Sequence, residues 1–572
     1  MVIFAFIGAS YGLREGVHVR VELLRTNMSE QTNAALDILI YIVALAFFII
    51  LGWFGGEWAY DSYIYGVTST AAVLKFPKWI VIAAIPVGCF LLCIQSLRMV
   101  ISSIHNLAKA PLGASSSRLI GKPPVVLSII IIALVIGVLL TFNVHLLVGL
   151  FFILLTLLFT GMPVAFALGA VGCLGVYLLF GSAQFIQLPL TAFKINSFPL
   201  TAAPLFILGG MLMSEAGLAE RIFSCVEVWL RRIPSPLLIA TVLSGGIFCA
   251  ITGSSVAATA AMSAICLPLL FARGYNKSHS CGAVAGSTVG TLIPPSAGFI
   301  LYGIIVDESI SQLFIAGVIP AAILFSLYIV FILLRPRITR KERLEQPLQP
   351  ASAKEKFEAL KSGVWGLIAP VIVLGGIYRG LFTPTEAGGI LVAYALVVGV
   401  FVLRTLKWKE LRASILKSTH LSLMILCIIS FAAIYGSVIS QNRVMGAVIG
   451  VVEVMNLSPT LFLLIVFFIL LILGMFLECV SIMLITLPLT FPVAMALGIH
   501  PLWFGVFYIL NGEIGLLTPP VGLNLFVIKG VSGMPLSSII RGTLPFLLIM
   551  LFTLVIIYLF PQTALWLPST MY

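Results

Sequence analysis

Hydroxyl and glycine residues gather where the apolar segments of this 572-residue chain are interrupted. In the first half, Gly253-Ser254-Ser255 divides one hydrophobic stretch, while Thr291 and Ser296 flank a break at Pro294-Pro295. Hydroxyls and unwound carbonyls are the hard oxygen ligands that a small cation prefers. Half-helix N-termini offer a carboxylate backbone amides and a positive dipole end, worth roughly 0.3–2 kcal/mol each. These residues therefore predict binding of a small cation and of a carboxylate.

A similar cluster occurs in the second half of the chain. Its members are Gly474, Glu478, Ser481, Thr518, Pro519, Gly522 and Asn524. Gly515-Leu-Leu-Thr-Pro519-Pro520 repeats the pattern of Gly290-Thr-Leu-Ile-Pro294-Pro295, and Gly542-Thr-Leu-Pro545 repeats that of Gly317-Val-Ile-Pro320. Both pairs are 225 residues apart. Paired, interrupted apolar segments in two halves indicate the binding site of a secondary transporter.

The composition places these clusters in a membrane protein. Hydrophobic residues make up 61% of the chain and charged residues 9%, with a mean hydropathy of +1.18. Apolar runs repeatedly reach the roughly 20 residues that a spanning helix needs, whereas long runs of alternating polarity, typical of a membrane β-barrel, are absent. We therefore predict an all-α polytopic membrane protein.

The net charge of +12 does not indicate nucleic-acid binding, because Lys and Arg are concentrated in short loops. These loops are 14–25, 98–122, 335–361 and 404–417. Basic residues in short loops are typical of the cytoplasmic side of a membrane protein. The lipid bilayer is the expected partner, and no nucleic acid is expected.

The charge pattern also predicts how the interrupted segments lie in the membrane. Segments 236–252 and 256–272 have basic residues at both ends, Arg232 and Arg273, which predicts a re-entrant hairpin with its tip at Gly253 to Ser255. A second hairpin, 459–499, is expected to enter from the opposite side. Segments 280–307 and 503–530 are expected to be discontinuous helices. Irregular backbone at membrane depth is tolerated only against protein or a wet cavity, so the tips are candidate sites.

Opposite orientations of the two hairpins predict an inverted repeat, 145–334 and 363–572, joined by a cytoplasmic linker, 335–362. The linker is expected to end in a surface helix, and 404–417 is expected to lie along the membrane surface before a span at 420–440. Further pairs support the repeat: Pro163 with Pro384, Gly210 with Gly436, and Pro268 with Pro488. The alternative is chance recurrence of Gly and Pro, which are frequent in membrane helices.

Several motifs resemble the large membrane subunit of tripartite ATP-independent periplasmic (TRAP) transporters over about residues 145–565. They are Pro204-Leu-Phe-Ile-Leu-Gly-Gly-Met-Leu-Met213, Gly217-Leu-Ala-Glu-Arg221, Leu292-Ile-Pro-Pro-Ser296, Phe314-Ile-Ala-Gly317, Gly380-Leu-Phe-Thr-Pro-Thr-Glu-Ala387 and Asn511-Gly-Glu-Ile-Gly-Leu-Leu-Thr-Pro-Pro-Val-Gly-Leu-Asn524. Residues 1–112 resemble the small membrane subunit. That subunit normally has four helices and three are expected here, so an upstream helix is expected to be missing. Residues 113–144, with a helix at 125–142, would join the two parts.

The resemblance implies a fused permease in the bacterial inner membrane that imports an organic acid, such as a C4-dicarboxylate or sialic acid, by an elevator mechanism. A periplasmic solute-binding protein would deliver the acid, sodium would drive import, and neither ATP nor a cofactor would be needed. We assign each cluster to a sodium site, with substrate between the hairpin tips. The expected cation-binding residues are Gly253, Ser254, Ser255, Thr291, Pro294, Gly474, Glu478, Thr518, Pro519 and Gly522. The expected substrate-binding residues are Ser255, Ser296, Ser481 and Asn524.

Alternative interpretations remain for individual residues. The serines are also suited to helix packing. Glu478 and Glu513 are ionisable residues at apparent membrane depth, which makes them functional candidates. At the position of Glu478 the family more often has aspartate, which puts its role in doubt. Glu386 fits a helix cap as well as a functional role.

Two other functions were compared with sodium-driven import. No HExxH, GxSxG or phosphate-binding loop is present in the sequence, so an enzyme is not expected. The main alternative is a proton-coupled or binding-protein-independent symporter of a related elevator fold. The motifs do not specify the acid, because specificity lies largely in the separate binding protein.

Overall fold

The computed structural model describes residues 1–16, 18, 20, 25, 28–68, 76–109, 123–143, 146–338, 350–440, 450 and 457–571. These residues are helical throughout, and their only β contact is an isolated bridge between Thr68 and Pro77. Among them, 11 helices are long and apolar enough to cross a membrane, or up to 12 if a bent pair forms one span. The predicted all-α polytopic class is confirmed.

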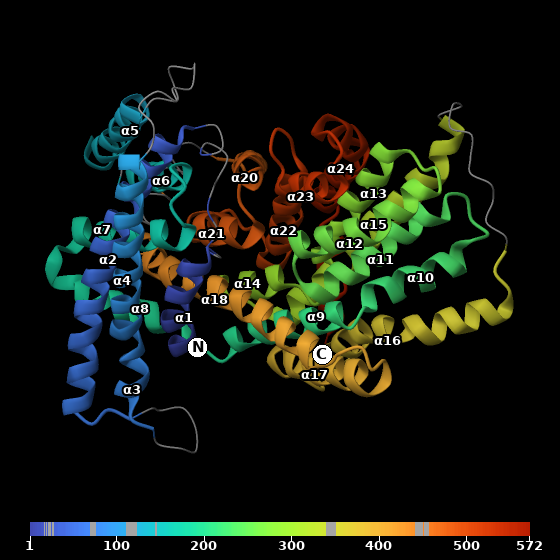
Figure 1. Ribbon diagram of the computed structural model, residues 1–572, viewed down its shortest axis with the longest axis horizontal. Coiled ribbons are helices and arrows are strands. Elements are labelled where there is room, and N and C mark those ends of the chain that lie inside the picture. Colours follow the sequence, from blue (N-terminus) through green and yellow to red (C-terminus); the bar gives the residue numbers. More distant parts are fainter. Residues whose placement is uncertain are drawn as a thin grey trace. The chain divides into compact units, whose positions relative to one another are not determined.

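The described residues form two compact units. Unit 1 comprises 1–197, 420–456 and 484–493, and unit 2 comprises 198–419, 457–483 and 494–572. The small-subunit-like region belongs to unit 1. Its helices are α1 (Val2–Glu15), α2 (Glu30–Ile64), α3 (Lys78–Ile82) and α4 (Ala84–Lys109). Helices α2 and α4 pack side by side along much of their length (Figure 1).

Unit 1 continues with α5 (Pro123–Asn143), α6 (Leu146–Phe159) and α7 (Val164–Phe180), which follow the predicted segments closely. An aromatic cluster joins the small-subunit-like helices to α7 and to the last part of α18 (Trp408–Ile439). Phe47 lies 5.0 Å from Phe431, and Phe48 lies 4.9 Å from Phe166, both edge to face. Such pairs contribute about 0.5–1.5 kcal/mol each beyond burial. The two predicted subunit regions therefore share one core in unit 1.

An ion pair fixes the start of α2. Arg25 contacts Asp37 at 2.6 Å and donates to the carbonyl of Asn33, and both charged side chains are mostly buried. We expect Asp37→Asn to lower the free energy of unfolding by about 1–3 kcal/mol, because Arg25 keeps its charge and loses its counter-ion. Thermal unfolding in detergent would measure this. Asp61→Asn, at an exposed position of the same helix, is the control, and an equal shift in both variants would contradict the expectation.

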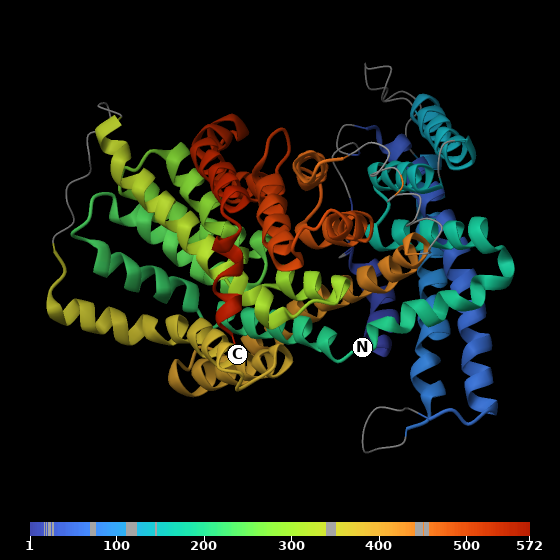
Figure 2. The same cartoon turned by 180° about the vertical axis from the view of Figure 1, so that it is seen from behind.

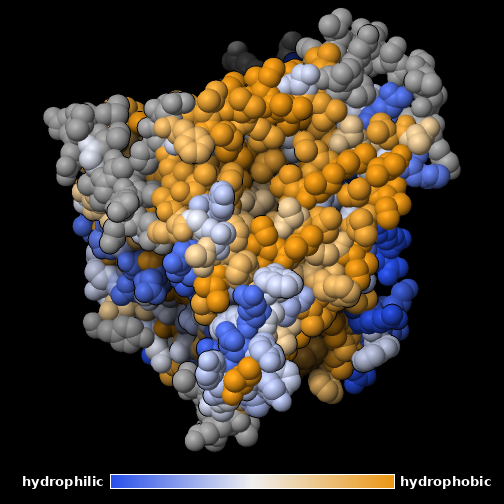
Figure 3. All heavy atoms as spheres, turned by 90° about the vertical axis from the view of Figure 1, so that its left-hand side faces the viewer, coloured by the Kyte–Doolittle hydropathy of each residue, from blue (hydrophilic) through white to orange (hydrophobic). Residues whose placement is uncertain are grey.

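The outer face of unit 1 is strongly apolar. Figure 3 shows a broad hydrophobic surface with hydrophilic residues gathered toward its lower part. Exposed residues of this kind on α2, α4 and α5 include Ile49, Trp53, Phe90, Ile94 and Val135. A contiguous apolar surface of this extent fits contact with lipid chains rather than with water.

Unit 2 contains most of the first repeat. Its helices are α9 (Ala202–Glu215), α10 (Leu218–Leu230), α11 (Pro236–Thr252), α12 (Ser255–Ala272), α13 (Lys277–Ser287), α14 (Ala297–Val306) and α15 (Ile310–Ile338). The predicted hairpin arms and interrupted segment are present, and the re-entrant character of the hairpin stays a prediction. A segment that the sequence did not reveal, 182–195, precedes Pro199–Glu215 with a bend of 57°.

The second repeat contains α16 (Ala353–Tyr378), α17 (Pro384–Leu396) with the π-helical extension η7 (Val397–Val402), and α18. It continues with α20 (Pro459–Gly474), α21 (Cys479–Ala496), α22 (Pro501–Leu517), α23 (Leu523–Ser532), α24 (Leu536–Leu559) and α25 (Gln562–Leu565). Helix α13 of the first repeat packs against α24, near the C-terminal end of the chain (Figure 2).

Two expected breaks in the second repeat are absent. The surface helix at the end of the linker continues directly into the next span as α16, and the surface arm at 404–417 is continuous with 420–440 as α18. The physical reason is that α18 contains no proline, and its only glycine, Gly436, lies in its last turn. Charged residues at a membrane boundary do not end a helix by themselves.

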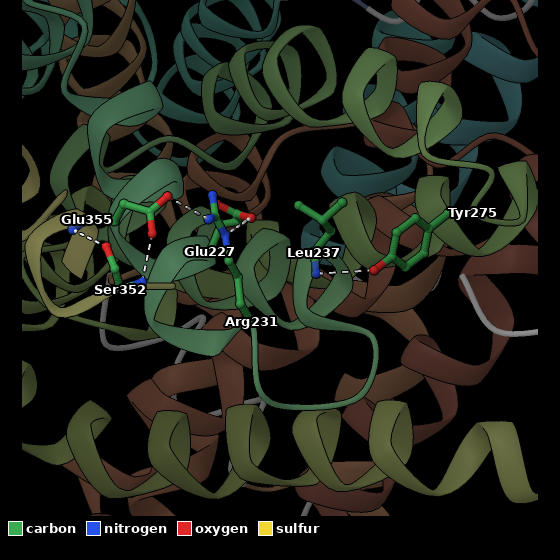
Figure 4. A network of polar contacts seen from close by, with 6 residues as sticks. All are labelled: Glu227, Arg231, Leu237, Tyr275, Ser352 and Glu355. Atoms are coloured by element: carbon green, nitrogen blue, oxygen red, sulfur yellow. Dashed lines mark hydrogen bonds and ion pairs between the residues drawn. The ribbon is translucent and has the colours of Figure 1, made fainter. Parts of the chain in front are cut away.

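Polar contacts tie α10 to the start of α16 within unit 2 (Figure 4). Arg231 donates to Glu227 at 2.9 Å and lies 3.6 Å from Glu355, and these contacts raise the pKa of the Arg231 guanidinium. Glu355 in turn forms a capping box with Ser352 at the start of α16. Thr383 and Glu386 form a second capping box at α17. The structural interpretation of Glu386, left open by its sequence, is therefore the one observed.

Candidate functional site

The tip of the first hairpin lies against the second break of its own repeat. Helix α11 ends at Thr252, Gly253 adopts a left-handed conformation at φ +65°, and Ser254 caps α12 by accepting from the Ala257 amide. A methyl group built at Gly253 would lie 3.3 Å from the Ala297 amide nitrogen, at the start of α14. Glycine suits this position because the backbone turns and approaches closely there.

The first repeat's Pro-Pro pair interrupts its helix as expected. The 3₁₀ helix η6 (Thr288–Leu292) ends before it, and Ile293 and Ser296 are extended. The Pro294–Pro295 bond is cis, as is Pro519–Pro520. The Ser296 side chain is buried, yet it makes no capping hydrogen bond to α14.

The second repeat has equivalent interruptions. Helix α20 ends at Gly474 and α21 begins at Cys479, so the predicted tip at Gly474 to Ser481 is a helix break. Helix α22 ends at Leu517, where the Thr518 hydroxyl donates to the Ile514 carbonyl at 2.6 Å. The chain becomes helical again at Leu523, after Gly522 at φ +62°.

Side chains from the two repeats meet at these breaks. The Thr291 hydroxyl donates to the Glu513 carboxylate at 2.8 Å. The Asn524 amide donates to the Ser255 hydroxyl at 2.7 Å and approaches the Thr288 hydroxyl at 3.4 Å. All five side chains are almost fully buried within unit 2. We name Ser255, Thr288, Thr291, Glu513 and Asn524 the inter-repeat cluster.

Several buried polar atoms around the breaks have no hydrogen-bond partner among the described residues. They are Ser296 Oγ, Ser481 Oγ, Glu478 Oε1, Glu513 Oε2, Asn524 Oδ1 and both amide atoms of Asn511. Buried polar groups in folded proteins are almost always paired. Their concentration here indicates where a ligand with complementary charge would bind. The part of the chain described contains no group of three or more His, Cys, Asp or Glu residues that suits a metal ion.

The structure brings together three predicted site residues, Ser255, Thr291 and Asn524. Asn524 was placed in the second cluster by sequence, but its hydrogen bonds go to Ser255 and Thr288 of the first repeat. Gly474 is also near the breaks, packed against Gly515. The ligand roles of all these residues stay predictions.

Sequence reasoning did not include Thr288, Asn511 or Glu513 in either cluster. Glu513 was signalled only as a carboxylate within an apolar segment. Thr288 lies one 3₁₀ turn before Thr291 on η6, and the sequence alone predicts an ordinary helix there, which would place these side chains differently.

Interrupted helices that meet at buried polar residues, in an all-helical chain with many candidate spans, define a membrane transport protein. Two family models match the chain. The tripartite ATP-independent periplasmic transporter DctM component matches residues 151–563, and the DctQ component of the same transporters matches residues 1–106. The chain therefore belongs to the TRAP transporter family and is a permease with both components in one polypeptide. Permeases of this family are multi-pass inner-membrane proteins rather than enzymes, and they work with a periplasmic binding protein.

Curated relatives agree with this assignment. A C4-dicarboxylate TRAP transporter large permease protein of Pseudomonas aeruginosa is 38% identical over 405 residues, covering 70% of this chain and 94% of the relative. A sialic acid TRAP transporter permease protein of Haemophilus influenzae is 33% identical, covering 66% and 61%. An isethionate TRAP transporter permease protein, DctMQ, of Oleidesulfovibrio alaskensis is 32% identical, covering 70% and 62%.

Among solved structures, the YdaH transporter of Alcanivorax borkumensis matches with a TM-score of 0.46 and 17% sequence identity. The match covers 68% of this chain and 89% of that chain.

Proposed function

We propose that this permease imports an organic acid together with sodium by an elevator mechanism, and that a periplasmic binding protein delivers the acid. The observation that carries the proposal is the inter-repeat cluster, in which Thr291 bonds to Glu513 and Ser255 bonds to Asn524 beside the interrupted helices. Oxygen ligands of this kind suit a small hard cation. Half-helix N-termini at α12 and α14 suit an acidic group.

The relatives support the substrate class. The proteins named above are described by a C4-dicarboxylate, sialic acid and isethionate, and a relative from Escherichia coli is described by 2,3-diketo-L-gulonate. All four are small organic acids that carry negative charge at neutral pH. An anionic group is therefore the feature that the substrate of this chain is expected to share.

The division into units supports the elevator part of the proposal. Unit 2 holds the inter-repeat cluster and both hairpin tips, whereas unit 1 holds the small-subunit-like helices. In an elevator transporter, the part that holds the substrate moves against a part anchored in the membrane. We assign the moving role to unit 2 and the anchoring role to unit 1.

Uptake of labelled organic acids into proteoliposomes tests the function. The full chain is reconstituted with its periplasmic binding protein, and sodium and proton gradients are imposed separately. We expect uptake to require both an inward sodium gradient and the binding protein. Uptake driven by a proton gradient in sodium-free buffer would favour the proton-coupled alternative, and uptake without the binding protein would favour a simple symporter.

The predicted ligand residues have their own test. Ser254→Ala and Thr518→Ala should raise the sodium concentration for half-maximal uptake by about threefold to tenfold, because each removes a hydroxyl near a helix break. Ser440→Ala, at an exposed position of unit 1, is the control. Sodium curves unchanged in both site variants would remove Ser254 and Thr518 from the assignment.

A further inference from the structure

We propose that the inter-repeat cluster is one shared cation site in which the carboxylate of Glu513 supplies the negative charge. The proposal rests on the proposed function and makes it more specific. Sequence reasoning assigned one separate sodium site to each repeat, and neither included Glu513 as a ligand. The expected ligand is a sodium ion, held by oxygens from the tip of the first hairpin, from η6, and from α22 and α23.

The printed contacts place these oxygens around one point. Thr288 and Thr291 are three residues apart on η6, and residues with this spacing lie above one another in a 3₁₀ helix. Asn524 contacts Thr288, and Glu513 contacts Thr291, so both side chains of the second repeat approach the same face of η6. Ser255 closes the group, because its hydroxyl accepts from Asn524 and also interacts with the Glu513 carboxylate.

The charge of Glu513 requires a partner that the described residues do not supply. Its side chain is 1% exposed, and only one carboxylate oxygen has a hydrogen bond that meets strict geometry. The ionisable groups close enough to act on it are Cys249, Tyr328 and Cys479, none of which carries a positive charge. An isolated buried carboxylate is very costly, and proteins compensate such a charge by pairing it or by binding a metal ion.

The remaining unpaired oxygen points to the same ligand. Asn524 Oδ1 is buried without a partner, as is Glu513 Oε2. Both are acceptors only, so a hydrogen-bond donor or a cation would satisfy them. A cation at this position would join the hairpin tip at Ser255 to α22 and α23. Sodium binding would then hold the first hairpin against the second repeat.

Melting of the purified full-length chain in detergent tests the site without any substrate. The melting temperature is measured over a series of sodium chloride concentrations, with potassium chloride added to constant ionic strength. A ligand that binds only the folded state raises the melting temperature in a saturable manner. We expect a sodium-specific rise in the natural chain. In Glu513→Gln the half-saturating sodium concentration should increase at least about tenfold, because one charged ligand is lost.

Matched variants keep the test interpretable. Glu358→Gln makes the same chemical change at an exposed position of α16 and should keep the natural half-saturation. Thr291→Val removes only the neighbouring hydroxyl, should weaken sodium severalfold, and replaces Glu513→Gln if that variant does not fold.

The outcomes separate this inference from the proposed function. Natural half-saturation in Glu513→Gln, or in Thr291→Val when the first variant does not fold, would overturn the shared site while leaving sodium-driven import intact. A natural chain without any sodium-specific rise would also overturn the site. Sodium-independent uptake in proteoliposomes would instead refute the proposed function itself.

Discussion

Replacing Pro294 and Pro295 together by alanine is expected to reduce uptake at least about 100-fold while leaving the protein folded. Proline in a helix interior is about 3 kcal/mol less favourable than alanine, so the variant permits η6 and α14 to join into one helix. Thr291 and Ser296 would then leave their present positions at the break. Loss of two polar contacts to a charged ligand, each worth about 1.5–3 kcal/mol, accounts for the expected factor.

Uptake into proteoliposomes and the melting temperature are to be measured on the same preparation. Pro320→Ala is the matched control, because Pro320 lies inside the unbroken helix α15 and near no site residue in the sequence. We expect this control to retain most of its uptake. Normal uptake by the double-alanine variant would show that the interruption is not needed for transport.

Gly515→Val is expected to destabilise the protein strongly, because α20 and α22 cross at two glycines. A methyl group built at Gly515 would lie 2.7 Å from the Gly474 Cα atom, and one at Gly474 would lie 2.7 Å from the Gly515 Cα atom. The obstructing atoms are backbone, so neither helix relieves the clash by rotating a side chain. Overpacking of this kind costs about 1–3 kcal/mol or more.

The same substitution should also impair transport, because α20 leads directly to the second hairpin tip at Gly474 and α22 leads to Thr518. Gly530→Val is the control: Gly530 lies in α23 with open space around it, and valine is a slightly better helix former than glycine. Thermal unfolding and sodium-dependent uptake are the two measurements. Equal stability of the two valine variants would mean that the crossing is looser than described.

Much of the fold follows from local properties of the sequence. Apolar length predicted the arms of both hairpins, and α11 begins and ends at the predicted residues 236 and 252. The Pro-Pro pairs predicted the interruptions before α14 and α23, because proline lacks an amide donor and disfavours helix at the preceding residue. The continuity of α18 was missed, since charge at a membrane surface locates a boundary without ending a helix.

The candidate site divides in a similar way. Sequence by itself determined which residues stand at helix breaks, Ser255 and Thr291 among them, because breaks depend on Gly and Pro within one segment. Only the tertiary structure decided that Asn524 meets Ser255, 269 residues away, and that Glu513 meets Thr291, 222 residues away. The physical reason is that hydrogen bonds between segments depend on how helices pack, and packing is set by many side chains together. The repeat in the sequence indicated two equivalent sites, whereas tertiary packing placed residues of both repeats in one cluster.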